Sequence, residues 1–137
     1  AAAPDVVLIH LGHNDLWYSQ SIESTISELG QIIDRLRAVN PRVKVLLAQI
    51  IPSAYGGELD RTPLLNARIP GLVTSKNTAL SPVRLVDQYT GFDPVADTVN
   101  LVHPDESGEK KIAARWFEVF DRLMRQNQSF YLPVIHR

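Results

Sequence analysis

Residues 6–11, VVLIHL, form a nearly unbroken apolar run that is rich in β-branched side chains and ends at Gly12. Such a run is typical of a strand that is buried on both faces of a sheet. Residues 22–39 follow with apolar side chains spaced by three and four positions, which predicts an amphipathic helix. Residues 43–50 are again apolar and stop at Pro52. Strand, helix and strand in this order predict two parallel strands joined by a helical crossover.

The rest of the chain repeats this pattern less regularly. Residues 64–80 predict a second helix, which Pro70 should kink or interrupt. Residues 83–87 predict a third strand, and a loop over residues 89–102 leads into a closing helix. We therefore expect an α/β fold with a parallel sheet. The apolar residues that share one face of the closing helix are Ile112, Ala113, Trp116, Phe117, Phe120 and Leu123, and we place Trp116 and Phe117 in the core.

Composition excludes several classes of function. The chain has 137 residues, a formal net charge of −1 and no cysteine. The near-zero charge removes the electrostatic argument for nucleic-acid or anionic-membrane binding, and no apolar run approaches the length of a membrane span. The absence of cysteine excludes a thiol nucleophile and a cysteine-ligated metal. The four histidines lack metal-ligand spacing, so we expect no metal, and we place His10 in the core as a hydrogen-bonded residue.

Two polar segments follow the predicted strands. In parallel sheets the ligand crevice lies at the carboxyl ends of the strands. Residues 12–15, GHND, follow the first strand directly. Gly12 allows a sharp turn and a close approach to a ligand, and the Asn14 amide can act as an oxyanion donor. The alternative is an ordinary turn, in which Asn14 and Asp15 bond their own backbone and begin the helix.

The second segment is His103-Pro104, immediately before the closing helix. Proline restricts the preceding residue to extended conformations, which holds His103 outside the helix. The nearby helix N-terminus disfavours the charged imidazolium, and this suits a neutral general base. The alternative is a loop histidine without chemistry.

Both segments resemble conserved blocks of one enzyme family. Residues 12–15 resemble the Gly-x-Asn-Asp block of the SGNH, or GDSL-type, hydrolases, and residues 100–104, NLVHP, followed by Gly108, resemble the last block of that family. Residues 48–53 and 65–73 are similar to its branch named carbohydrate esterase family three, which contains acetylxylan esterases.

The resemblance implies a three-layer, flavodoxin-like α/β/α sandwich that performs serine-dependent ester hydrolysis without a cofactor. His103 is the expected base, Asn14 the expected oxyanion donor, and Gly12 belongs to the same oxyanion block. The expected substrate is an acylated carbohydrate or another small ester, and the resemblance favours an extracellular or periplasmic location. The candidate substrate-binding residues are His13, Trp17 and Tyr55, although the two aromatic side chains can equally pack their loops down.

The chain departs from the family by lacking the Gly-Asp-Ser block that carries the nucleophile and a second block that contributes a glycine N–H. Ser53 and Ser107 do not occupy a tight strand-to-helix elbow. We therefore expect residues 1–125 to be the C-terminal portion of a domain that is incomplete at its N-terminus, with the missing block either on a second polypeptide or lost. The strand at residues 6–11 then has an exposed edge. Residues 126–137 are assigned to a tail or edge segment, with a loop at 126–128.

The second departure is Asn100, which stands where the family has the triad aspartate. An amide cannot stabilise the imidazolium by charge. Another group, such as Asp97, Asp93 or a backbone carbonyl, can then orient His103. Otherwise the chain is a catalytically inactive carbohydrate-binding or interaction domain. An unrelated flavodoxin-like ligand-binding or signalling module also fits the topology, but the chain has no glycine-rich phosphate loop.

Overall fold

The sheet is built from three parallel strands. The computed structural model describes residues 3–54 and 61–128. In it β1 (Val6–Ile9), β2 (Lys44–Gln49) and β3 (Val83–Asp87) lie in the order β1-β2-β3, so β2 is central. The predicted α/β fold with a parallel sheet is therefore confirmed.

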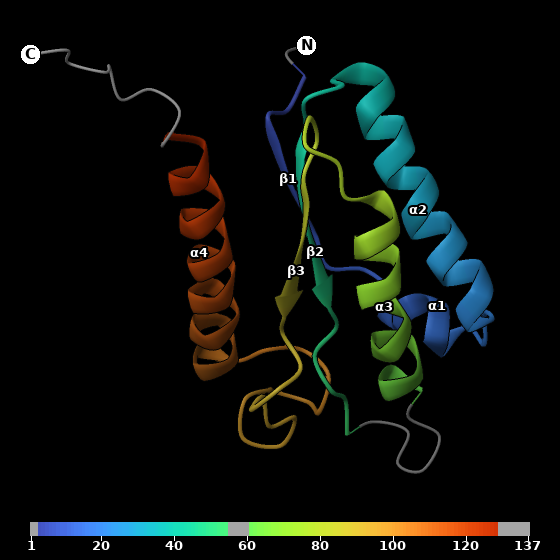
Figure 1. Ribbon diagram of the computed structural model, residues 1–137. Helices are drawn as coiled ribbons and strands as arrows, with labels where there is room; N and C mark the ends of the chain where they lie inside the picture. Colours follow the sequence, from blue (N-terminus) through green and yellow to red (C-terminus); the bar gives the residue numbers. More distant parts are fainter. Residues whose placement is uncertain (1–2, 55–60, 129–137) are drawn as a thin grey trace, which may run out of the picture.

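Helices cover both faces of this sheet. They are α1 (His13–Trp17), α2 (Ile22–Val39), α3 (Thr62–Lys76) and α4 (Glu106–Gln128). The short helix α1 follows β1, α2 and α3 cover one face, and α4 stands alone on the other (Figure 1). The result is the predicted three-layer arrangement. Among the described residues, no helix is both long enough and apolar enough to cross a membrane.

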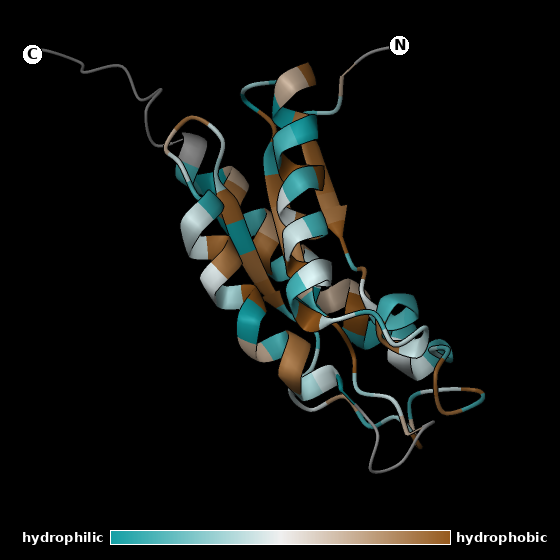
Figure 2. Cartoon of the chain, turned by 90° about the vertical axis from the view of Figure 1, so that its right-hand side faces the viewer, coloured by the Kyte–Doolittle hydropathy of each residue, from teal (hydrophilic) through white to brown (hydrophobic). Residues whose placement is uncertain are grey.

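The α2 helix follows its sequence signals closely. Its N-terminus is capped by Ser21, whose hydroxyl oxygen accepts a hydrogen bond from the Ser24 N–H at 3.1 Å. Its C-cap is Asn40, directly before Pro41, which cannot continue the helix. The outer side of the helix is largely hydrophilic while the strands behind it are hydrophobic (Figure 2).

The expected interruption of the second predicted helix does not occur, because α3 runs through Pro70. Proline has no N–H, so the carbonyl of Asn66, four residues earlier, loses its helical partner. That carbonyl instead accepts a hydrogen bond from the Gln49 side chain at 3.1 Å. The Asn66 side chain also bonds both the N–H and the carbonyl of Ile50, each at 2.8 Å. These bonds hold α3 against the end of β2.

The core has two parts of unequal size, one on each face of β2. Four consecutive residues of β2, Val45 to Ala48, are fully buried. Val45 and Leu47 join the larger cluster beneath α2 and α3, whereas Leu46 and Ala48 join a smaller cluster with Leu123 of α4.

The α4 helix corrects two sequence-based predictions. Phe117 is not in the core but 69% exposed, and Ala113 is also exposed. Trp116 packs against the smaller cluster as predicted. The physical reason is that α4 lies over β2 and β3, while its apolar surface is wider than the sheet beneath it. The predicted loop at residues 126–128 is also wrong, because α4 continues to Gln128; residues 129–137 lie outside the described part.

Candidate active site

The loops that leave the three strands are hydrogen-bonded to one another. The ring nitrogen Nε2 of His13 lies 2.9 Å from the carbonyl oxygen of Ile51, to which it donates. In the same loop after β2, the Ser53 hydroxyl and the Ala54 N–H donate to the Leu101 carbonyl at 3.2 and 3.1 Å. The two sequence blocks that resemble the hydrolase family are thus linked through the loop between them.

The first block turns sharply at Gly12, which has a φ of 132° and precedes α1. A β-carbon at this position would lie 2.6 Å from Cδ2 of Leu65, so glycine is required both for the backbone conformation and for space. The Asn14 side chain is exposed, and α1 has no side-chain capping hydrogen bond. Among the described residues the Asn14 amide therefore does not cap α1 and is open to a ligand, while the position of Asn14 at the start of a helix is what the turn interpretation expects.

A cavity of about 280 Å³ adjoins this block. It lies between the end of β1, α1 and α2, and both Gly12 and Asn14 line it. Its other polar lining includes His10, Asp15 and Glu28. The Asn14 amide therefore borders a space that can hold a small polar group.

The second block holds His103 in a tight loop. The carbonyl of His103 accepts the Val99 N–H at 2.9 Å, and Oδ1 of Asn100 accepts the His103 N–H at 2.9 Å. Leu101, between them, has the left-handed φ of 69° that closes the loop. The geometry fixes the backbone on both sides of His103 and leaves its side chain exposed.

The ring nitrogen Nδ1 of His103 contacts the Asn100 side chain. It lies 3.0 Å from Nδ2 and 3.1 Å from Oδ1 of Asn100. A bond from Nδ1–H to Oδ1 leaves a lone pair on Nε2, as a general base needs. A bond from the Nδ2 amide to Nδ1 puts the proton on Nε2 and removes that base. An aspartate would permit only the first arrangement, so Asn100 positions the ring without fixing its tautomer.

Asp97, the alternative acid, has different partners. Its buried carboxylate accepts hydrogen bonds from Lys111 at 2.6 Å, from the Asp93 N–H at 2.8 Å and from Ser107 at 3.0 Å. The Lys111 bond and these further donors hold the pKa of Asp97 below its usual range. The structure thus brings Asn100 to His103, whereas Asp97 ties the loop after β3 to the first turns of α4.

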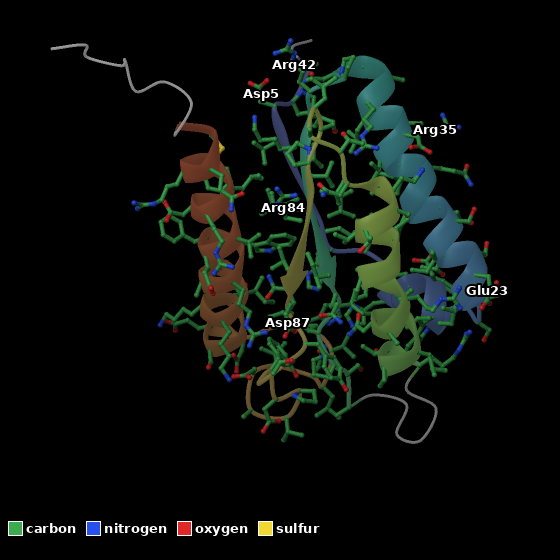
Figure 3. All side chains as sticks on the ribbon, viewed as in Figure 1. Asp5, Glu23, Arg35, Arg42, Arg84 and Asp87 are labelled. Carbon is green, nitrogen blue, oxygen red and sulfur yellow. The ribbon has the colours of Figure 1, made fainter. Side chains whose placement is uncertain are left out.

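Asp87 and Arg115 were not singled out by the sequence analysis, yet they anchor the same loop. Asp87 ends β3 (Figure 3) and accepts the N–H groups of Tyr89 and Thr90, each at 2.9 Å. Burial acts to raise the pKa of this carboxyl, but these hydrogen bonds and the nearby Arg115 guanidinium outweigh it and lower the pKa. Arg115 of α4 donates to the backbone carbonyls of Asp87 and Thr90. The recognisable signal is an Asx-type turn after a strand.

His10 differs from its prediction. It is largely buried, with its ring 6.3 Å from the rings of both His13 and Trp116, but its Nε2 atom has no hydrogen-bond partner among the described residues. Burial, assisted by the nearby His13, lowers the pKa of His10 to about 4, so the ring is neutral at pH 7. The expectation that this core histidine is hydrogen-bonded is therefore incorrect at Nε2.

Two candidates remain. Trp17 is exposed at the end of α1, and Tyr55 lies outside the described residues. Across residues 3–54 and 61–128, no three histidine, aspartate or glutamate side chains are grouped to hold a metal ion.

The fold and these two loops define an α/β protein of the SGNH hydrolase type. Residues 1–111 match the family model described as GDSL-like lipase/acylhydrolase, and the chain belongs to this family.

Its relatives include carbohydrate esterases. The crystal structure of a family 3 carbohydrate esterase from Talaromyces cellulolyticus matches with a TM-score of 0.81 and 32% identity, covering 90% of this chain and 60% of that one. A family 3 carbohydrate esterase from Clostridium thermocellum gives a TM-score of 0.73 and 32% identity, covering 90% and 59%. A protein from Acetivibrio thermocellus, provisionally named endoglucanase X, is 32% identical over 117 residues, which are 84% of this chain and 49% of that protein. The chain thus spans about half to three fifths of these relatives.

Proposed function

We propose that this chain supplies the general base and one oxyanion donor of a serine-dependent carboxylic ester hydrolase. The observation that carries the proposal is the contact between Nδ1 of His103 and Asn100, in a loop hydrogen-bonded toward the block that contains Asn14. A histidine held at Nδ1 presents Nε2 outward, and this is the geometry of a base that activates a hydroxyl.

The proposed substrates are acetyl or other short acyl esters of carbohydrates. Two of the solved relatives are family 3 carbohydrate esterases, and another is an acetyl esterase mutant crystallised with an acetate ion, at 32% identity and a TM-score of 0.81. The exposed Trp17, near the Asn14 block, offers an aromatic face of the kind that stacks on sugars.

In the proposed reaction, Nε2 of His103 takes the proton of a serine hydroxyl as its oxygen attacks the ester carbonyl. The tetrahedral oxyanion accepts a hydrogen bond from the Asn14 amide. Collapse of this intermediate breaks the bond to the sugar oxygen, which takes the proton from His103. A water molecule, deprotonated by the same His103, then attacks the acyl-serine; the acyl group leaves as a carboxylic acid, and the serine oxygen takes the proton back from His103.

We propose that the serine lies on a polypeptide outside these 137 residues. The chain has no Gly-Asp-Ser block, and 40% of the Talaromyces cellulolyticus esterase lies outside the match. Ser107 donates to the Asp97 carboxylate at 3.0 Å and Ser53 donates to the Leu101 carbonyl at 3.2 Å, and these bonds support a nucleophile outside this chain.

The test is hydrolysis of p-nitrophenyl acetate by the chain combined with the part of the Talaromyces cellulolyticus esterase that it does not match. We expect turnover by the combination and none by either part alone. His103→Ala should abolish this turnover, and Asn14→Ala should lower kcat by about 10²–10³. Val95→Ala, an exposed change in the same loop as His103, is the control and should leave the rate unchanged. If a verified complex shows no turnover, the proposed activity is contradicted.

The alternative function is a catalytically inactive carbohydrate-binding or interaction domain, and Asn100 is the observation that favours it. An amide gives the imidazolium no charge stabilisation, and in serine proteases the equivalent exchange costs about 10⁴ in kcat. Asn100→Asp in the complex separates the two functions. A large gain over a measurable starting rate supports a weakened esterase. Glycan binding without hydrolysis in both variants supports the binding domain.

A further inference from the structure

The loop between β3 and α4, residues 88–105, contains a buried carboxylate. Asp97 is only 2% exposed, although it lies in a loop with many exposed residues. A buried charge is unfavourable unless it is paired and hydrogen-bonded. Asp97 is paired with Lys111 of α4, whose Nζ atom lies 2.6 Å from Oδ2 and whose side chain is 41% exposed. The loop therefore depends on a cation from a neighbouring helix to keep this carboxylate buried.

The backbone of Asp97 connects the two arms of the loop. Its N–H donates to the Asp93 carbonyl at 2.8 Å, and its carbonyl accepts the Asp105 N–H at 3.0 Å. The next residue, Thr98, forms an antiparallel bridge with Pro104. Asp97 thus joins the first arm of the loop to the residues that follow the candidate base directly.

His103 lies inside this closed loop. Its carbonyl accepts the Val99 N–H at 2.9 Å, next to the bridge between residues 98 and 104. Its ring contacts Asn100, which belongs to the same loop. A displacement of the loop would therefore carry the ring and Asn100 together, without breaking the contact between them.

The start of α4 holds the loop through Asp97. Besides the Lys111 bond, the Ser107 hydroxyl donates to Oδ1 of Asp97 at 3.0 Å, and Lys111 also donates to the Gly91 carbonyl at 3.4 Å. A β-carbon at Gly108 would lie 2.2 Å from the Asp97 carbonyl oxygen, so the helix backbone and the loop are in close contact. A long helix is a firmer support for a site than a loop is.

The neighbouring lysine shows why the Lys111 pair is unusual. Nζ of Lys110 also lies 2.6 Å from a carboxylate, that of Glu106. These side chains are 73% and 84% exposed, and both belong to α4. Such a surface pair contributes little to stability. Loss of the Lys111 cation would instead leave the Asp97 carboxylate buried and uncompensated.

We propose that Lys111 is a positioning residue, which acts through Asp97 to fix the place of His103 and does not touch the substrate. The inference rests on the proposed function, in which His103 is the base. A base must lie within hydrogen-bond reach of the proton that it takes, and a displacement of about 1 Å can lower the rate by about 10². His103 acts in both acylation and deacylation, so its displacement slows both steps and lowers kcat with little change in KM.

The experiment measures hydrolysis of p-nitrophenyl acetate by the complex with the unmatched part of the Talaromyces cellulolyticus esterase. Lys111→Met should lower kcat at least tenfold and leave KM within twofold. Lys111→Arg keeps the cation at a partly exposed position and should retain at least half of the wild-type kcat. Lys110→Met is the matched control and should stay within twofold of the wild type. Unchanged kcat in Lys111→Met, or equal losses in the two methionine variants, overturns the proposal.

A double variant separates the position of His103 from the stability of the chain. Lys111→Met alone leaves a buried charge without its partner and lowers stability. Adding Asp97→Asn removes that charge, so urea denaturation should show that most of the lost stability returns. The kcat of the double variant should nevertheless remain at least fivefold below that of the wild type, because the bond to α4 is still absent. Recovery of kcat together with stability overturns the proposal.

Hydrogen exchange tests the loop without any hydrolysis. In the 137-residue chain alone, the Val99 and Asp105 amides should exchange at least tenfold faster in the double variant than in the wild type. The Val45 amide, which donates to the Pro82 carbonyl within the sheet, is the internal control and should change less than threefold. Unchanged Val99 and Asp105 amides overturn the proposal. Faster exchange at both supports the hold of Lys111 on the loop even if the complex has no turnover, a result that would contradict the proposed function separately.

Discussion

The two faces of the sheet are stabilised in different ways. Under α2 and α3, a continuous cluster of fully buried side chains, including Ile33, Leu47 and Leu65, fills the space between helices and sheet. Under α4 the buried cluster is small, and the helix is attached mainly at its start, where Lys111 bonds the Asp97 carboxylate at 2.6 Å.

The residues that form the larger core and the residues that hold the candidate site therefore lie on opposite faces of the sheet. Most of the buried apolar side chains lie beneath α2 and α3, whereas the polar attachments of α4 hold the loop that carries His103. The part of α4 distant from these attachments presents Phe117 and Phe120 to the exterior. The start of α4 therefore supports the candidate site, while the rest of the helix leaves apolar side chains exposed.

The largest expected effect contrasts one large side chain from each face. Leu47→Ala removes a fully buried side chain beneath α2 and α3 and should lower the free energy of unfolding by about 3 kcal/mol. Phe117→Ala removes a larger but mainly exposed side chain and should change it by less than about 0.5 kcal/mol. Urea denaturation of both variants measures the difference. A loss above about 1.5 kcal/mol in Phe117→Ala would show that the isolated chain already buries this residue.

The next effect concerns one glycine in the helices of each face. A β-carbon at Gly108 would lie 2.2 Å from the backbone carbonyl oxygen of Asp97, so Gly108→Ala should cost about 2–3 kcal/mol by pushing α4 away from the loop. Gly71 in α3 has nothing within 4 Å of such an atom, and Gly71→Ala should stabilise the chain by about 0.5–1 kcal/mol. Thermal unfolding, monitored by circular dichroism, measures the change in stability of both variants. A stabilising Gly108→Ala would refute the close contact.

A smaller effect depends on pH and on His10, which lies on the α4 face. Its pKa is about 4 in the folded chain and near 6.5 when unfolded, so between these values the unfolded state binds more protons. Stability is therefore lost as the pH falls through this window, by about 2 kcal/mol between pH 7 and pH 5. In His10→Phe this loss should largely disappear. Urea denaturation at the two pH values compares the proteins, and an equal loss in both would assign the pH dependence to other groups.

Much of the structure on the α2 and α3 side of the sheet could be predicted from sequence, because the sequence signals for it are local. Apolar periodicity predicted α2, and the apolar runs predicted all three strands. Continuation of α3 through Pro70 could not be predicted, since it depends on a hydrogen bond from Gln49 on another element. Exposure of Phe117 was also beyond prediction, because periodicity gives the apolar side of a helix but not the width of the sheet beneath it.

The candidate site was predicted only as residues, not as contacts. The motifs singled out His103 and Asn100, and the structure places them together at Nδ1. The same motifs left Asp97 as an alternative acid, because sequence distance could not show that its carboxylate bonds Lys111 and Ser107. The lack of a hydrogen-bond partner at Nε2 of His10 likewise has no sequence signal, since a polar residue within an apolar strand is normally hydrogen-bonded in the core.

The smallest expected effect lies in the loop before α4, where the backbone is strained. Leu101 has a φ of 69°, which costs a residue with a β-carbon about 1–2 kcal/mol. Leu101→Gly should relieve this cost, and after the greater freedom of glycine in the unfolded chain it should stabilise by about 0.5 kcal/mol. Val99→Gly, two residues away and without a positive φ, is the matched control and should destabilise by a similar amount. Chemical denaturation in parallel resolves the opposite signs, and destabilisation of both variants would mean that the Leu101 side chain contributes more by packing than its backbone conformation costs.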